Sequence, residues 1–572
     1  MTGNRGISEE RTMRTGKRIA ARNLALTGVT GALLALTACG GGDDSPAPNP
    51  TPVATLQAVP DNVSVDPTVA CSMSGIGATP LTADTTLTGD IAAATILDVS
   101  TSTTGAGPSD KPYCLVKVKV DPQINIWVTL PTSAWNGRLR SEGGGGYAGS
   151  VGVAADSVRQ GFAGVQTDTG HPAAVGGAFG MASVGVPNAQ LQVDFAYRSE
   201  HLMAVIGKQL VKAFYAQDPY RTYWYGCSTG GRQGMRMAQQ FPDDYDAILA
   251  GAPAMHWDRF QAYQIWPQVV MRAETGGPIA RAKLALATSS AVNSCDAADG
   301  VTDGVIGDPR TCQYDVTKDS AITTSTCTSA DNTCLTIGEA SAIQKIWGGA
   351  RNTSNTLLWP GVERGADLSG LAGTNPFAIA VQQPQYWVYF DPTWDWTTLN
   401  YANYEAFFNQ TVAAVGPLMA SDDPDLTRFR ARGGKVIMFH GWADQLIMSE
   451  GTTLYYDAMQ QSLSAANVPN DFAKLYMVPG MGHCGGGAGP NQFGQGNGTT
   501  VPQTADRDIF RALMAWSEKG TEPQAIVATH FTNNNTALAV DRTRPLCVYP
   551  QVAKYSGSGS TDDAANFTCS AP

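Results

Sequence analysis

The chain has 572 residues, a formal net charge of −11 and 43% hydrophobic side chains, which is the composition of a globular protein. This length is enough for one large domain with a big insertion, or for two or three domains. The acidic balance excludes a protein that binds nucleic acid electrostatically, because such proteins neutralise phosphates with clustered Lys and Arg. We therefore expect no nucleic-acid partner.

The first 39 residues have the pattern of an export signal. Basic residues precede a short apolar run, LALTGVTGALLALTA, that ends at Cys39. The run is short for a membrane-spanning helix, which needs about 20 apolar residues, and suits the core of a signal peptide. The ending LTAC resembles a bacterial lipoprotein signal, which implies that Cys39 is lipidated; an ordinary signal peptide cut nearby is the alternative. We expect an outer-membrane lipoprotein, a periplasmic protein or a secreted one, with no membrane contact other than this anchor.

Residues 40–68 are rich in Pro, Gly, Ala and Asp, which predicts a flexible linker. After it, apolar runs typical of strands alternate with helical patterns. The predicted strands are 114–120, 124–131, 162–171, 222–228, 245–253, 435–444 and 473–484, the later ones running into loops, and the predicted helices are 201–217 and 230–241. This alternation predicts an α/β fold with a mainly parallel sheet.

The alternation is interrupted between about residues 254 and 424. This block holds four cysteines, an Asp-rich loop and a dense run of aromatic residues over 386–404. We interpret 254–424 as a lid inserted into one α/β domain, whose two parts are 69–253 and 425–572.

A nucleophile motif, Gly226-x-Ser228-x-Gly230, lies between a predicted strand and a predicted helix. That context is what a nucleophile elbow requires, because the serine must sit on a sharp turn with small residues on both sides. A serine hydroxyl is a poor nucleophile until a base takes its proton, and the base is usually a histidine held by a carboxylate.

Chain order selects the base and the acid. In α/β-hydrolases the serine comes first, then Asp or Glu, then His. Asp444 ends the strand 435–444, and His483 lies in a glycine-rich loop after the next strand. We therefore predict a triad of Ser228, Asp444 and His483, with His530 as the alternative base.

Acyl transfer also needs hydrogen-bond donors for the oxyanion. The residue after the nucleophile, Thr229, offers one backbone N–H. The glycine loop 141–146, SEGGGG, follows an early strand and offers the second, from Gly143 or Gly144.

The same loop has a competing interpretation as a dinucleotide fingerprint. Gly144, Gly146 and Gly149 have the G-x-G-x-x-G spacing, and Asp168 follows at about the expected distance. The match is weak, because a run of glycines readily produces this spacing by chance. The residues that follow are also poorly suited to begin a phosphate-binding helix. Export also argues against a nicotinamide enzyme.

Eleven cysteines are present. With Cys39 as a lipid anchor, ten remain in an exported chain, which supports five disulfides. Two cysteines flank the predicted triad: Cys227 precedes Ser228, and Cys484 follows His483. If the triad forms, these two must meet, so we expect a bridge between them.

This combination resembles the tannase and feruloyl esterase family of α/β-hydrolases, over nearly the whole chain after residue 70. The stretches that carry the resemblance are GCSTGGRQG, FPDDYDAILAGAP, HGWAD, VPGMGHCGGG and RTRPLCVYPQVAKYSGSG. It implies a serine esterase acting on esters of aromatic acids, with the triad above and with the amides of Gly143 and Thr229 as the oxyanion hole. The pairs it implies are Cys71–Cys114, Cys227–Cys484, Cys295–Cys312, Cys327–Cys334 and Cys547–Cys569.

The loop CDAADGVTDGV offers oxygens for a cation: the carboxylates of Asp296, Asp299 and Asp303 and the carbonyls of Val301 and Val305. Mixed carboxylates and carbonyls suit Ca²⁺, although the spacing is not that of an EF-hand, and the loop is also explained as a series of Asp-Gly turns. The resemblance implies a structural Ca²⁺ here. We expect no organic cofactor.

The aromatic run of the lid suggests a pocket that stacks on a planar acyl group. A bacterial member of the resembled family hydrolyses mono(2-hydroxyethyl) terephthalate and grips its carboxylate with a lid arginine, whereas residues 365–427 contain no Lys or Arg. We therefore expect a small neutral aromatic ester, feruloyl or galloyl in type, as the substrate. The alternatives are hydrolysis of the terephthalate monoester and a non-catalytic surface protein that binds aromatic compounds.

Overall fold

The computed structural model describes residues 53–82, 93–107, 109–496 and 500–572. The predicted export segment, with Cys39, and most of the predicted linker lie outside the described residues. The described residues belong to one compact unit, Asn49–Pro572. Within them, no helix combines the length and the apolar character that crossing a membrane requires.

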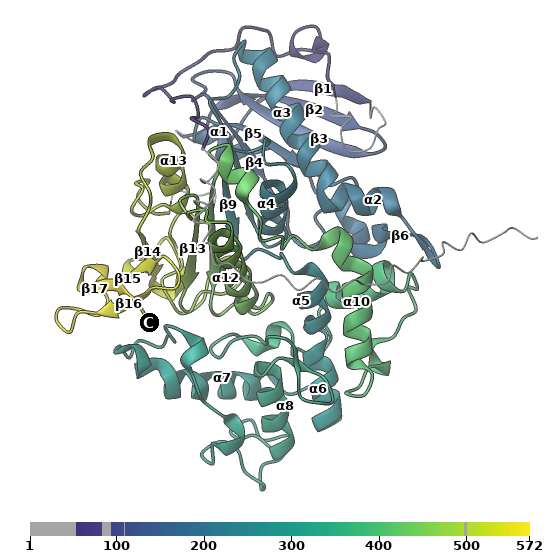
Figure 1. The fold of residues 1–572 in the computed structure, drawn as a ribbon, viewed down its shortest axis with the longest axis vertical. Helices are drawn as coiled ribbons and strands as arrows, with labels where there is room; N and C mark the ends of the chain where they lie inside the picture. Colours follow the sequence, from purple (N-terminus) through teal and green to yellow (C-terminus); the bar gives the residue numbers. More distant parts are fainter. Residues whose placement is uncertain (1–52, 83–92, 108, 497–499) are drawn as a thin grey trace, which may run out of the picture. The chain divides into compact units, whose positions relative to one another are not determined.

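A nine-stranded sheet with strand order β1-β2-β3-β5-β4-β8-β9-β12-β13 forms the centre of this unit (Figure 1). Its strands are β1 (Ala94–Thr103), β2 (Pro112–Val120), β3 (Ile124–Pro131), β4 (Arg138–Glu142), β5 (Ala163–Thr167), β8 (Arg221–Cys227), β9 (Ala247–Gly251), β12 (Lys435–Gly441) and β13 (Ala473–Val478). From β5 to β13 every pairing is parallel. The strands β1, β2, β3 and β5 pair antiparallel. The α/β prediction is confirmed. The sequence pattern does not predict strand β1, because most of its residues are polar. In the structure, the second half of this strand is largely exposed.

The helices and the small hairpins surround this sheet. The helices are α1 (Ala155–Arg159), α2 (Ala189–Val193), α3 (Ser199–Tyr215), α4 (Thr229–Gln240), α5 (Trp257–Gln264), α6 (Trp266–Thr275), α7 (Arg281–Cys295), α8 (Ile337–Trp347), α9 (Ala378–Gln383), α10 (Tyr404–Met419), α11 (Thr427–Ala431), α12 (Ser449–Ala465) and α13 (Ile509–Lys519). The remaining strands are β6 (Met181–Ser183), β7 (Val186–Pro187), β10 (Ala350–Arg351), β11 (Leu357–Trp359), β14 (Ala525–Phe531), β15 (Val540–Cys547), β16 (Val552–Tyr555) and β17 (Phe567–Ser570).

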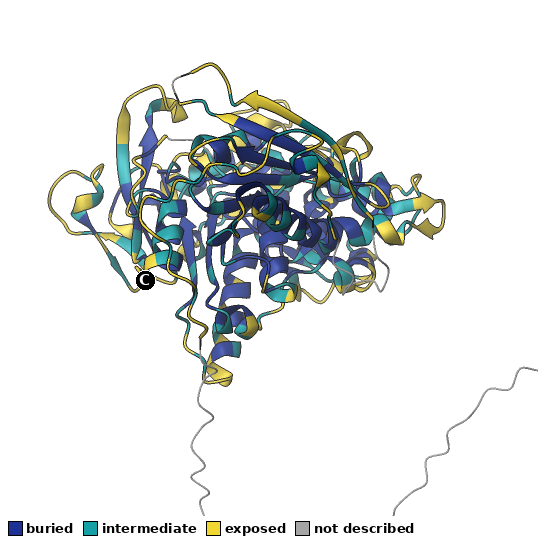
Figure 2. Cartoon of the chain, turned by 90° about the horizontal axis from the view of Figure 1, so that it is seen from above, coloured by how far each residue is buried: buried dark blue, intermediate teal, exposed yellow. Residues whose placement is uncertain are grey.

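The parallel strands are buried on both faces. In β12, Val436 and Met438 pack in the apolar cluster that includes α3 and α12. Ile437 and Phe439 pack in the cluster on the other face, with α13. Figure 2 shows the resulting dark-blue centre, with exposed residues at the loops and edges. Because side chains alternate along a strand, His440 at the end of β12 falls on the face that α12 covers.

The chain between β9 and β12, which are neighbours in the sheet, contains α5 to α11 and the hairpin β10–β11. Most of these helices gather below the sheet in Figure 1. They form an apolar cluster of their own, to which Tyr147 and Phe195 from the sheet domain contribute. The segment interpreted as a lid, 254–424, falls within this insertion.

Five disulfides join the ten described cysteines. The pairs are Cys71–Cys114, Cys227–Cys484, Cys295–Cys312, Cys327–Cys334 and Cys547–Cys569. These are the pairs that the family resemblance implies.

Candidate active site

Ser228 stands on a sharp turn between β8 and α4. Its backbone has φ 63° and ψ −124°, a conformation that costs a residue with a side chain free energy and that is typical of a nucleophile elbow. The flanking glycines make the turn sterically possible, since a Cβ on Gly226 would come within 2.5 Å of the backbone of Gly230. The turn points the serine away from the sheet, at the N-terminus of α4.

Asp444 lies in the turn after β12, and its side chain is fully buried. Its Oδ1 accepts the backbone N–H groups of Leu446 and Ile447 at 2.8 and 2.9 Å. Its Oδ2 accepts from Nδ1 of His483 at 2.7 Å and from Nε2 of His440 at 3.0 Å. Burial by itself would raise the pKa of Asp444, but the charge of His483 and the hydrogen bonds from both rings outweigh it and hold the pKa well below its ordinary value. The carboxylate is therefore ionised at neutral pH.

His483 lies in the glycine-rich loop after β13, and its backbone N–H donates to Oε1 of Gln445 at 3.1 Å. Burial lowers the pKa of His483, while the charge of Asp444 and its hydrogen bond raise the pKa by more, so the net shift is upward. Because Nδ1 is held by Asp444, Nε2 is the ring nitrogen available to a substrate or a nucleophile.

Ser228 and His483 line the same cavity. In the described part of the chain, no hydrogen bond joins the Ser228 hydroxyl to the His483 ring, and such bonds commonly tighten only when substrate binds.

Pairing with a carboxylate does not by itself identify a base. His201, His256 and His530 also contact aspartates, at 2.7, 2.7 and 2.5 Å. Among the described histidines, only His483 lines the cavity that contains Ser228. His530, the alternative base in the sequence, pairs within the hairpin β14–β15 and is not part of this cavity.

The cavity has a volume of about 400 Å³, which is in the range of small-molecule sites. Its lining residues are Gly145, Gly146, Cys227, Ser228, Thr229, Ala254, Trp257, Phe260, Gln261, Gln264, Phe377, Ile379, Leu446, Ile447, His483 and Cys484. Apart from His483, no side chain in this lining is ionisable. The wall is thus apolar, with two neutral amide side chains.

The aromatic run predicted to line the pocket lies elsewhere. Trp387 stacks with Tyr147 inside the apolar cluster of the lid, and Tyr389 stacks with Trp394. The cavity instead receives one face of α5, whose lining residues have the i, i+3, i+4, i+7 spacing that follows Trp257. That spacing is visible in the sequence and was the available signal for these pocket residues.

The glycine loop after β4 lies beside the serine, but not every amide in it is free. The amide of Gly143 donates to the carbonyl of Tyr225 at 2.9 Å, as part of the pairing of β4 with β8. The amide of Gly144 donates to a side-chain carbonyl on α4 at 3.0 Å. The amides of Gly145 and Thr229 donate to no acceptor in the described part of the chain, and both residues line the cavity. The available donors are therefore Gly145 and Thr229, in place of the expected Gly143 and Thr229.

Asp168, the acidic residue of the dinucleotide interpretation, already has hydrogen-bond partners within the fold. The Asp168 carboxylate accepts the backbone N–H groups of Asn125 and Gly170, both at 2.9 Å, and is buried. It ties β3 to the end of β5. Its place in the structure is explained by this contact.

The Asp-rich loop after α7 is held together by its own carboxylates. Asp296 accepts the backbone N–H groups of Asp303 and Gly304 at 3.1 and 2.8 Å. Burial, together with the charges of Asp303 and Asp296, raises the pKa of Asp299 to about 6, against the opposing hydrogen bond from the Val301 amide. Repulsion from the neighbouring carboxylates thus adds to the effect of burial on Asp299.

The same loop is also tied to β15. The Asp303 carboxylate pairs with Arg542 at 3.1 Å and with Arg544. In the described structure, the loop carboxylates do not form a cluster with ligand oxygens within 4.8 Å of one another. A cation bound by all of them requires Asp303 to be shared with these arginines or released from them.

The fold and the site define the class of protein. The central sheet is mixed, and its parallel strands are followed by a strained serine after β8, an aspartate after β12 and a histidine after β13. This arrangement is that of an α/β-hydrolase. The model of the family described as tannase and feruloyl esterase matches residues 113–570. The chain belongs to this family, and it is a carboxylic ester hydrolase.

Individual proteins that resemble the chain carry names that match this family. A probable feruloyl esterase of Arthroderma benhamiae is 31% identical over 459 residues, covering 78% of this chain and 82% of the relative. The crystal structure of feruloyl esterase B from Aspergillus oryzae superposes with a TM-score of 0.74 at 27% identity, covering 83% of this chain and 97% of the other. Tannin acyl hydrolase from Aspergillus niger, at 22% identity, shares the fold with a TM-score of 0.71, covering 88% and 96%.

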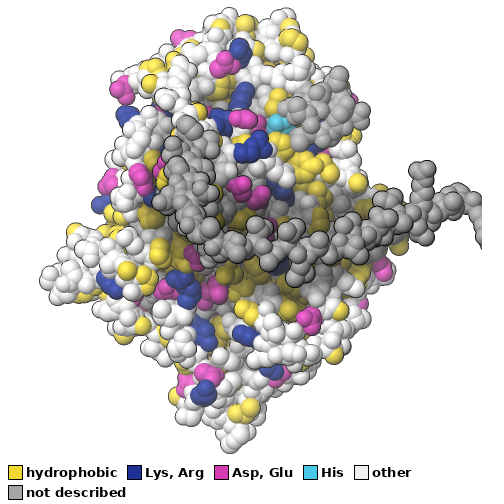
Figure 3. All heavy atoms as spheres, viewed as in Figure 1, with side chains coloured by type: hydrophobic (Ala, Val, Ile, Leu, Met, Phe, Trp, Pro, Cys, Tyr) yellow, Lys and Arg dark blue, Asp and Glu magenta, His cyan; other side chains and the backbone are white. Residues whose placement is uncertain are grey.

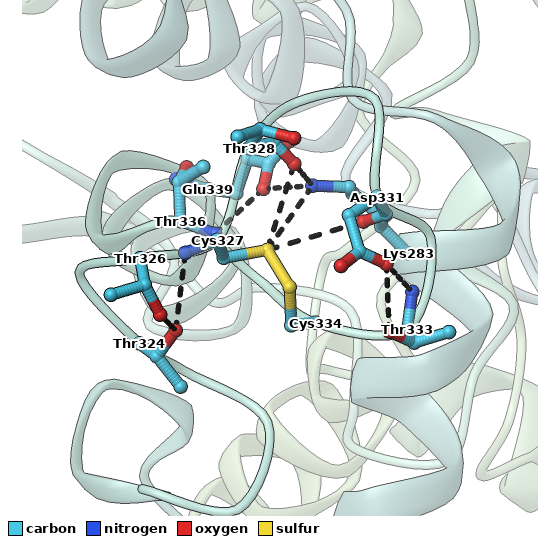
Figure 4. Close-up of a disulfide and its surroundings, with 10 residues drawn as sticks. All are labelled: Lys283, Thr324, Thr326, Cys327, Thr328, Asp331, Thr333, Cys334, Thr336 and Glu339. Atoms are coloured by element: carbon cyan, nitrogen blue, oxygen red, sulfur yellow. Dashed lines mark hydrogen bonds and ion pairs between the residues drawn. A yellow bond between two sulfur atoms is a disulfide. The ribbon is translucent and has the colours of Figure 1, made fainter.

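The bridge Cys227–Cys484 joins the residue before Ser228 to the residue after His483, so we predict that removing it lowers ester hydrolysis at least tenfold in folded protein. The variant is C227S/C484S. The matched control is C327S/C334S, which opens a lid bridge whose surroundings Figure 4 shows, with Lys283 donating to Glu339 at 2.6 Å.

Loop closure by the two bridges differs, with sequence separations of 257 and 7 residues. The chain-entropy model gives losses of about 5.6 and about 2.4 kcal/mol in the free energy of unfolding. Activity per folded molecule is therefore measured well below both melting temperatures. Equal activity in the two variants would contradict a role for the bridge in placing the site.

Proposed function

We propose that the protein is an exported serine carboxylesterase that hydrolyses esters of neutral aromatic acids, feruloyl or galloyl in type. One observation carries the proposal: Ser228 and a carboxylate-bound His483 line one largely apolar cavity, and among the described lining residues no side chain other than His483 is ionisable. The names of the relatives, feruloyl esterase and tannin acyl hydrolase, support the same substrate class.

The reaction runs through an acyl-enzyme. Nε2 of His483 takes the proton from the Ser228 hydroxyl as the oxygen attacks the ester carbonyl, and then gives it to the departing alcohol. Asp444 holds the ring by Nδ1 and stabilises the imidazolium that forms. Water, activated by the same histidine, then releases the acid.

The backbone N–H groups of Gly145 and Thr229 are the proposed oxyanion donors. Two free amides at an apolar cavity stabilise a developing negative charge more strongly than water does, and one such donor is worth roughly 10²–10³ in kcat. The hydroxyl of Thr229 donates to the carbonyl of Gly146 at 2.5 Å, which fixes the glycine loop against α4.

The charge of the pocket supports a neutral acyl group. A carboxylate on the acyl ring, as in a terephthalate monoester, would be buried in this cavity without a cation, at a cost of several kcal/mol. A feruloyl or galloyl ring carries hydroxyl or methoxyl groups instead. On the face drawn in Figure 3, acidic side chains lie among the basic ones. That face therefore offers no continuous basic surface that would bind a negatively charged polymer.

Export accounts for the cysteines. Five disulfides are stable in the periplasm or outside the cell and are rare in a reducing cytosol. We propose that residues 1–39 direct export and that Cys39 carries the lipid anchor. The mass of the mature N-terminal peptide tests this, and a chain that begins elsewhere than at a diacylglyceryl Cys39 would refute the anchor.

The Asp-rich loop is proposed as a structural Ca²⁺ site, with ligands from Asp296, Asp299, Asp303 and the carbonyls of Val301 and Val305. The donors fit the ion in type, since all are oxygens, and the charges of Asp303 and Asp296 contribute to the raised pKa of Asp299. The bridge Cys295–Cys312 closes the loop. The site is remote from the proposed triad in sequence, and the proposed role of the ion is structural.

The substrate proposal is tested with methyl ferulate, a gallate ester and mono(2-hydroxyethyl) terephthalate, comparing kcat/KM by product release. We expect at least a tenfold preference for one of the neutral esters, and loss of all three activities in S228A. Ile379 lines the cavity, so I379R should favour the terephthalate monoester relative to the uncharged control I379Q.

A wild-type preference for the terephthalate monoester would overturn the argument from the uncharged wall. Unchanged hydrolysis in folded S228A would overturn the proposed nucleophile.

Removal of Ca²⁺ with EGTA should lower the melting temperature by several degrees and leave kcat unchanged below it, because the ion stabilises the native loop by mass action. D299N should have the same melting temperature with and without EGTA. A wild-type melting temperature insensitive to both EGTA and added Ca²⁺ would refute the site.

A further inference from the structure

A second histidine contacts the proposed catalytic acid. Oδ2 of Asp444 accepts from two rings at once, Nδ1 of His483 at 2.7 Å and Nε2 of His440 at 3.0 Å. Oδ1 accepts the two backbone amides that follow in the turn. Four donors thus surround one carboxylate, which leaves it little rotational freedom.

The fold holds His440 rigidly in this place. It is the penultimate residue of β12, its side chain is fully buried, and the alternation along the strand turns it toward α12. There Nδ1 of His440 meets the hydroxyl of Thr452 at 2.8 Å. Both ring nitrogens therefore have a partner.

These contacts fix the ring as a donor to Asp444. A carboxylate only accepts hydrogen bonds, so Nε2 of His440 carries a proton. The Thr452 hydroxyl, which can donate or accept, satisfies Nδ1. His440 is then a fixed hydrogen-bond donor to Asp444.

We propose that His440 is a positioning residue of the proposed esterase: it holds Oδ2 of Asp444 on Nδ1 of His483 and limits how strongly that oxygen binds the His483 ring. This inference rests on the proposed triad. It assigns a role to a side chain that makes no contact with the cavity.

Sharing an oxygen has a predictable electrostatic effect. A donor on Oδ2 withdraws negative charge from the bond to His483, so it keeps His483 less basic than an unshared carboxylate would. Apart from Asp444 and His483 themselves, the titratable group that faces this hydrogen-bonded pair is His440 from β12. Helix α12 contributes Thr452, which does not titrate. Loss of the His440 donor should therefore raise the pH at which His483 loses its proton.

The experiment compares H440L, H440Q and wild type by kcat, KM and the pH profile of kcat/KM. H440L removes the donor, and we expect kcat to fall about 10- to 100-fold, as for other residues that orient a catalytic group, with KM within about twofold. The acidic limb of the profile should move to higher pH. H440Q places an amide N–H near the position of Nε2 and should restore most of kcat.

A matched control is H201Q, which alters another buried histidine that contacts an aspartate, Asp244 at 2.7 Å, outside the site. It should lower the melting temperature without moving the pH profile. If H440L does not fold, T452V provides the test, because it removes only the partner of Nδ1 and should shift the profile in the same direction by less.

A readout without substrate separates this inference from the proposed function. The downfield proton resonance of Nδ1–H in His483 reports its bond to Asp444, and it should shift in H440L and not in H201Q. Wild-type kcat, pH profile and resonance in folded H440L, or in T452V where H440L is unfolded, would overturn the inference. Activity in S228A would instead overturn the nucleophile, whatever the resonance shows.

Discussion

The covalent bridge between the serine turn and the histidine loop is the contact on which the site depends. Ser228 follows β8 and His483 follows β13, and β9 and β12 lie between these strands. Neighbouring strands are about 4.8 Å apart, so the two strand ends are separated by about 14 Å. The loop after β13 must therefore turn back across the sheet, and the bridge holds the Cα atoms of Cys227 and Cys484 6.1 Å apart.

The acid stands between the two. Asp444 follows β12, the strand next to β13, and its four hydrogen bonds keep the ionised carboxylate stable without exposure to water. The strain at Ser228 is offset by the packing of α4 on the sheet and by the small residues on each side of the turn. The ends of rigid strands thus position all three side chains, while the segment 254–424 contributes part of the cavity wall.

The sequence predicted the parts that depend on local pattern. The strand, the motif and the helix around Ser228 form as expected, and chain order was enough to nominate Asp444 and His483. The choice of Gly143 as an oxyanion donor failed for a non-local reason, because the pairing of β4 with β8 consumes its amide. The contact of His440 with Asp444 was also hidden, since it depends on how the turn after β12 folds back.

The lid residues that line the pocket were also not predicted from the sequence. A dense aromatic run in the lid suggested a stacking surface, but density of aromatics does not distinguish a lid core from a cavity wall. The helical spacing on α5 was the better signal, because it places four side chains on one face regardless of the rest of the fold. Residues 365–427 contain no Lys or Arg, and none of the described residues that line the cavity is a Lys or an Arg.

The most direct measurement is the site of covalent modification by an aryl fluorophosphonate, a reagent that mimics the tetrahedral state of ester hydrolysis. Intact-mass and peptide analysis should find a single adduct, on Ser228, whose formation stops when His483 is replaced by Ala. An adduct on another residue, or full ester hydrolysis by a protein that the reagent leaves unmodified at Ser228, would contradict the triad.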